Sequence, residues 1–172
     1  MPASKSKRKG KKHAGRGRTH CLAGVPFSAI KYLPFTDEER RDIALDVEMN
    51  FRAVRSGAKS RLEFDNAART VASHFEAAAV LSEHLIDKGK IYAEALRVGI
   101  AKLYLIYSAT VRGRPMDETL WPSIERGVDA VLAIYAQCSR AELFEAFRVV
   151  RVRAMRVEAE LLKQEKEKGK RK

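Results

Sequence analysis

The chain has 172 residues, of which 45% are hydrophobic, so it can bury one core and is expected to form a single domain. Its two cysteines, Cys21 and Cys138, stand in no CxxC or Cys/His spacing, which argues against a disulfide framework or a zinc finger. No apolar segment typical of a secretory signal follows the charged N-terminus. We therefore expect a cytoplasmic protein with unpaired thiols, associated with a nucleoid or nucleus as the open alternative.

The net charge of +12 is unevenly distributed along the chain. Residues 1–19 contain eight basic residues and no acidic one, and residues 151–172 contain nine basic residues against four acidic ones. Between them, 17 basic residues face 18 acidic ones, so the middle of the chain is nearly neutral. Positive ends on a neutral body are typical of proteins that meet phosphate, anionic lipid or an acidic protein surface.

The first 19 residues are rich in Lys, Arg and Gly and lack apolar periodicity, which predicts a disordered basic arm. Such an arm can contact phosphates without a fixed backbone, and a solubilising tail or a localisation signal is the alternative. Its candidate nucleic-acid-binding residues are Lys5, Lys7, Arg8, Lys9, Lys11, Lys12, Arg16 and Arg18.

Residues 20–35 are expected to form an extended apolar strap, because Pro26 and Pro34 prevent a long helix. We expect the strap to pack along the body of its own chain. A docking peptide for a partner, or a strap exchanged between protomers, is the alternative. The residues that favour burial are Leu22, Val25, Phe27, Ile30, Tyr32, Leu33 and Phe35.

Three capping boxes, which begin at Thr36, Ser60 and Ser139, predict three helix N-termini. Apolar stripes at helical spacing follow each of them, and two further stripes lie between the second and third boxes. The sequence therefore predicts an all-α fold, a single-domain bundle of about five helices within residues 36–166, with a basic C-terminal tail at 167–172. The predicted helices cover residues 37–56, 60–88, 90–111, 117–138 and 139–166.

The segment 91–111 is apolar nearly all round, which favours a helix at the centre of the bundle. Glu94, Arg97 and Lys102 lie within it, and each charge would cost roughly 2–3 kcal/mol at the centre of a bilayer, so we expect no membrane span. The only tryptophan, Trp121, is expected to close one end of the bundle, with a surface anchor for a partner as the alternative.

The last predicted helix combines a heptad-like apolar seam with arginines. The seam comprises Leu143, Phe147, Val150, Ala154, Val157 and Leu161, and we expect the helix to protrude beyond Leu162. Together with the lysine-rich end of the chain, the arginines form a candidate surface for binding a nucleic-acid backbone. Glu145 and Glu160 interrupt this surface, so a self-paired, solvated face is the alternative. The candidate residues here are Arg148, Arg151, Arg153 and Arg156.

No combination of residues predicts catalysis or a cofactor. His74 and His84 are ten residues apart and angularly separated on one helix, so they cannot share a metal ion. The spacing of Ala95, Gly99 and Leu105 matches a helix-turn-helix unit weakly, because apolar side chains follow where a recognition helix needs polar ones. We therefore expect a protein that is not an enzyme and needs neither cofactor nor metal.

The leading hypothesis is a non-enzymatic nucleic-acid-associated protein that binds DNA or RNA phosphates through its basic termini. The alternative is a helical protein–protein interaction module, such as an adaptor, an inhibitor or an oligomeric structural component. Attachment to an anionic membrane is disfavoured, because no lipidation motif or amphipathic anchor accompanies the basic ends.

Overall fold

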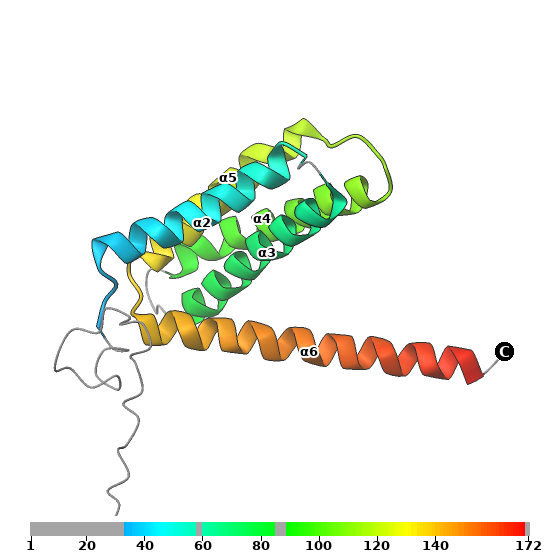
Figure 1. The fold of residues 1–172 in the computed structure, drawn as a ribbon. Coiled ribbons are helices and arrows are strands. Elements are labelled where there is room, and N and C mark those ends of the chain that lie inside the picture. The colour runs from blue at the N-terminus through cyan, green and yellow to red at the C-terminus, as the bar shows by residue number, and fades with distance from the viewer. Residues whose placement is uncertain (1–32, 58–59, 85–88, 171–172) are drawn as a thin grey trace, which may run out of the picture.

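The computed structural model describes residues 33–57, 60–84 and 89–170, and this part of the chain is all-α (Figure 1). The predicted fold class is therefore confirmed. The basic arm and most of the strap lie outside the described residues, as do residues 85–88. The elements are α2 (Asp37–Arg55), α3 (Arg61–His84), α4 (Gly89–Val111), the short 3-10 helix η1 (Glu118–Leu120), α5 (Trp121–Tyr135) and α6 (Arg140–Lys170).

The helices begin where the capping residues predict. At Thr36 and at Ser139, the hydroxyl accepts the N–H of the glutamate three residues later, and that carboxylate accepts the N–H of the cap. The Ser60 hydroxyl likewise accepts the N–H of Glu63. Because these signals lie within four residues of sequence, they fix the helix starts locally.

The predicted helix 117–138 is two elements. Asp117 caps η1 through its side chain, and α5 then begins at Trp121 with Pro122 in its first turn and ends at Tyr135. Trp121 is buried and meets the Phe51 ring edge to face, with ring centroids 5.9 Å apart. Its burial excludes the alternative of a surface anchor, and its role in closing one end of the bundle stays a prediction.

The centre of the bundle is α3, and the prediction that 91–111 is the central helix is wrong. Helix α3 packs against α2, α4, α5 and α6, whereas α4 packs against α3, α5 and η1. The outer face of α4 leaves Ile91 74% exposed and Leu105 51% exposed. The alanines of α3 explain its position, because small side chains allow four helices to approach closely.

The closest approach in the core is built from one phenylalanine and two glycines. Phe75 of α3 is fully buried, and its ring lies against Gly99 of α4 and Gly127 of α5. A Cβ atom on Gly127 would lie 2.2 Å from Phe75 Cε1, and one on Gly99 would lie 2.4 Å from the same atom. Both glycines are therefore needed where three helices share the space of one ring.

We predict that Gly127→Ala lowers the free energy of unfolding by about 1–3 kcal/mol, because overpacking outweighs the better helix propensity of alanine. Chemical denaturation followed by the fluorescence of the single tryptophan measures this loss. In a Phe75→Leu background, the same Gly127→Ala change should cost much less. An equal cost in both backgrounds would show that the ring is not the cause.

Candidate nucleic-acid interface

Helix α6 is partly packed and partly free (Figure 1). Its first turns pack against α3, with Leu143, Ala146 and Val150 buried. From Arg151 to Gln164 every side chain is exposed. The protrusion predicted to begin after Leu162 therefore begins after Val150, because α6 diverges from α3 and the other helices of the described chain do not accompany it.

The four candidate arginines of α6 fall into two groups. Arg148 pairs with Glu145 through two hydrogen bonds, and its Nε lies 2.7 Å from Glu145 Oε2. This contact lowers the pKa of Glu145 and raises that of Arg148. The remaining three are exposed and have no ion-pair partner among the described residues: Arg151, Arg153 and Arg156.

Successive residues of a helix are rotated by about 100°, so these three arginines point to different sides of α6. Arg151 and Arg153 flank the face that continues the buried seam, and Arg156 lies on the far side. Among the four candidate arginines of α6, the alternative of a self-paired, solvated face therefore applies to Arg148 alone. The basic residues from Lys5 to Arg18 lie outside the described residues, so their role stays a prediction.

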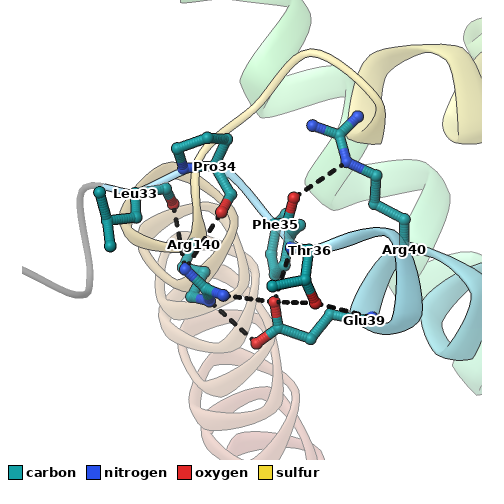
Figure 2. A network of polar contacts seen from close by, with 7 residues as sticks. All are labelled: Leu33, Pro34, Phe35, Thr36, Glu39, Arg40 and Arg140. Carbon is teal, nitrogen blue, oxygen red and sulfur yellow. Dashed lines mark hydrogen bonds and ion pairs between the residues drawn. The ribbon is translucent and has the colours of Figure 1, made fainter. Parts of the chain in front are cut away.

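The direction of α6 is set at its first residue, Arg140 (Figure 2). Arg140 Nε donates to Glu39 Oε1 at 3.0 Å, and Nη1 donates to the carbonyl oxygens of Pro34 at 3.1 Å and Leu33 at 3.4 Å. Its guanidinium also lies 5.7 Å from the centre of the Phe35 ring. A cation in the first turn opposes the helix dipole, and the Glu39 carboxylate of α2 compensates it.

The end of the strap is held from α2 as well. Arg40 Nε donates to the Phe35 carbonyl oxygen at 3.2 Å, and its Nη1 donates to the carbonyl oxygen of Ala136 after α5. Pro34 pairs with Ser139 in an isolated antiparallel bridge. The last strap residues therefore join the start of α2 to the junction between α5 and α6.

A polar cluster around the buried His74 links four helices. His74 of α3 places Nε2 3.1 Å from Asp46 Oδ2 of α2 and Nδ1 3.1 Å from the Tyr135 hydroxyl of α5, which donates to the His74 carbonyl oxygen. The Phe147 ring of α6 meets the imidazole edge to face. Burial lowers the pKa of His74 and raises that of Tyr135, so neutral side chains are favoured here. This cluster positions the helices.

Cys138 is a free, buried thiol, as predicted, and burial raises its pKa to about 11. Cys21 lies outside the described residues. Within the described chain, no group of three or more His, Cys, Asp or Glu side chains is placed to hold a metal ion. No helix of that part combines the length and the apolar character that crossing a membrane requires.

Two clefts lie between α2 and α5. One has a volume of about 180 Å³ and is lined by Arg40, Ile43, Ala44, Leu132, Tyr135 and Ala136. The other, of about 300 Å³, is bordered by both signs of charge, including an ion pair between Arg55 and Glu125. Neither cleft is lined by the four candidate arginines of α6. No protein-family model, curated protein or solved structure matches the chain.

We predict that Glu39→Gln destabilises the protein near neutral pH and has much less effect near pH 2. The hydrogen bonds from Arg140 are the main cause that lowers the pKa of Glu39 from 4.5 to about 2. The unfolded chain therefore takes up this proton first as the pH falls. The stability contributed by Glu39 is complete above pH 4.5 and is lost between pH 4.5 and 2.

Because 41% of the Glu39 side chain is exposed, solvent screening reduces this contribution to about 1 kcal/mol. Urea denaturation between pH 2 and 7 measures it. Glu38→Gln is the matched control, since it removes an exposed charge from the same helical turn. If the control lost as much stability with the same pH dependence, the helix dipole rather than Arg140 would be responsible.

Proposed function

We propose that the chain is a cytoplasmic, non-enzymatic nucleic-acid-associated protein that binds phosphate backbones through its basic termini, with association with a nucleoid or nucleus as the alternative location. The observation that carries the proposal is the free half of α6, where Arg151, Arg153 and Arg156 are exposed without ion-pair partners in the described chain. Unpaired arginines on an isolated helix can contact phosphates without first breaking an internal salt bridge.

The shape of α6 supports the same proposal. A helix with its side chains is about 10–12 Å wide, and the major groove of B-DNA is about 12 Å wide and admits a helix. Arginines on different sides of a helix in a groove can reach phosphates of both strands. The basic residues of the arm and the tail would add contacts that depend on charge alone, so DNA and RNA are both candidate ligands.

We predict submicromolar binding to duplex DNA or structured RNA at low salt, with an affinity that falls steeply as salt rises. Changing Arg151, Arg153 and Arg156 together to Gln should weaken binding about tenfold or more. The slope of log K against log salt should fall by about 0.9 for each arginine that contacts a phosphate of B-DNA. Fluorescence anisotropy with nuclease-treated protein at several salt concentrations measures both quantities.

The matched control changes Arg41, Arg69 and Arg114 to Gln, which removes three exposed arginines from the body and gives the same net charge. It should weaken binding much less. An equal loss in both triple variants would mean that net charge, and not α6, determines affinity. Deletion of residues 1–19 tests the arm separately, and an unchanged affinity and salt slope would remove it from the proposal. Absence of binding near physiological salt would contradict the function itself.

A second candidate function, a helical protein–protein interaction module, is favoured by the apolar side chains that α6 leaves exposed. Val157 and Leu161 are each 55% exposed, and they continue the face that is buried earlier in the same helix. If this function is correct, the chain forms a complex or an oligomer that tolerates salt. Charge-neutral substitutions in the arm should not disturb this complex. A strict monomer without a protein partner in sedimentation experiments would count against it.

A further inference from the structure

The apolar face of α6 that packs on α3 continues along α6 beyond the last residue that contacts α3. Leu143 and Val150 are buried on this face, and Ala154, Val157 and Leu161 repeat its heptad spacing on the free half of the helix. Val157 and Leu161 are more than half exposed. Within the described chain, this free seam, defined as residues 150–161 of α6, has no partner beyond Val150.

Charges flank the free seam in a regular order. Arg151 and Glu158 lie along one side, and Arg153 and Glu160 lie along the other. On both sides an arginine precedes a glutamate by seven residues, which is two helical turns. An identical helix that runs in the opposite direction therefore places glutamate opposite arginine on both sides.

We propose that two copies of the chain associate through an antiparallel pair of α6 helices centred between Met155 and Arg156. In this register Ala154 packs against Val157 of the second copy, and the two-fold symmetry forms this contact twice. Val150 is buried against α3 and takes no part in the contact between copies. The flanking ion pairs then join Arg151 to Glu158 and Arg153 to Glu160, each across the interface and each formed twice by the two-fold symmetry.

Other arrangements of the same two helices do not satisfy these charges. An antiparallel pair shifted by one heptad places Glu158 opposite Glu158 and Glu160 opposite Glu160, both repulsive. A parallel, in-register pair joins Arg153 of one copy to Glu158 of the other. The same arrangement places Glu160 opposite Glu165, and these two glutamates repel each other. Charge complementarity therefore selects both a second copy as the occupant and one register for it.

The size of the free seam sets the strength of the contact. Residues 150–161 span about 18 Å, because a helix rises about 1.5 Å per residue. Helix α3 covers the seam up to Val150, so the contact between the two copies is confined to the residues that follow it. A contact of about three turns is smaller than a standard stable interface, so the dimer is weak and forms at micromolar or higher concentration.

The inference does not rest on the nucleic-acid proposal, and it is tested without nucleic acid. Sedimentation velocity of the nuclease-treated, full-length chain from about 5 to 500 µM should show a reversible monomer–dimer equilibrium. Arg153→Glu should raise the dissociation constant about tenfold or more, because two attractive pairs become repulsive. Adding Glu160→Arg to that variant should restore dimerisation.

Arg156→Glu is the matched control, since it makes the same charge change on the side of α6 away from the free seam, and it should leave the dissociation constant unchanged. Circular dichroism confirms that each variant keeps its helix content. Truncation after Lys163 should leave the dimer intact, although it removes basic residues from the tail.

Three results would overturn the proposal. The first is a monomer over the whole concentration range. The second is a dimer whose dissociation constant Arg153→Glu does not change, which would place the contact elsewhere. The third is rescue of Arg153→Glu by Glu158→Arg instead of Glu160→Arg, since that pairing belongs to the parallel arrangement. Each of these outcomes leaves the test of nucleic-acid binding untouched.

Discussion

The ion pair between Arg140 and Glu39 is the contact on which the orientation of α6 depends. It joins the first turn of α6 to the first turn of α2, although the two residues are 101 positions apart. Arg140 also holds the carbonyl groups of Leu33 and Pro34, so one guanidinium joins the end of the strap, α2 and α6. A few turns later, Phe147 packs on His74. With both points fixed, α6 can only leave the body in one direction.

That direction gives α6 two properties that α2 to α5 do not combine. Arg151, Arg153 and Arg156 have no ion-pair partner in the described chain, and the apolar seam beyond Val150 is exposed because α6 diverges from α3. A helix that stayed on the body would have buried Val157 and Leu161, and its charges would have faced the surface of its own domain. The divergence after Val150 thus generates both the proposed phosphate contacts and the proposed contact between copies.

The sequence predicts structural features that depend on residues close together in the chain. It does not predict the features that depend on packing between residues far apart in the chain. Thr36, Ser60 and Ser139 mark helix starts because a cap and its glutamate lie within four residues. The positive φ angle of Gly57, +80°, likewise fits a local turn signal at the end of α2. In contrast, the apolar composition of 91–111 does not show which side meets α3, and it gave the wrong central helix.

The same limit applies to the candidate site. The heptad seam and the four candidate arginines of α6 are visible in the sequence, but the position at which the seam loses its partner depends on the angle between α6 and α3. The role of Arg140 was missed, although one signal was present. A basic residue directly after an N-cap opposes the helix dipole, so a nearby carboxylate is favoured. Asp65 of the same helix has this role for Arg61, and Glu39 of α2 has it for Arg140.

Glu158 and Glu160 of α6 affect both of its proposed contacts, the one with phosphate and the one with a second copy. For phosphate binding, Glu158 and Glu160 are unfavourable, because they repel the same backbone that the arginines attract. For an antiparallel pair of helices, both glutamates are required, and each stands seven residues after an arginine on its own side. Arg151 and Arg153 cannot serve a phosphate and a second copy at once, whereas Arg156 is free in both states. Dimerisation and nucleic-acid binding by this helix are therefore expected to compete, and higher nucleic-acid concentration should favour the monomer.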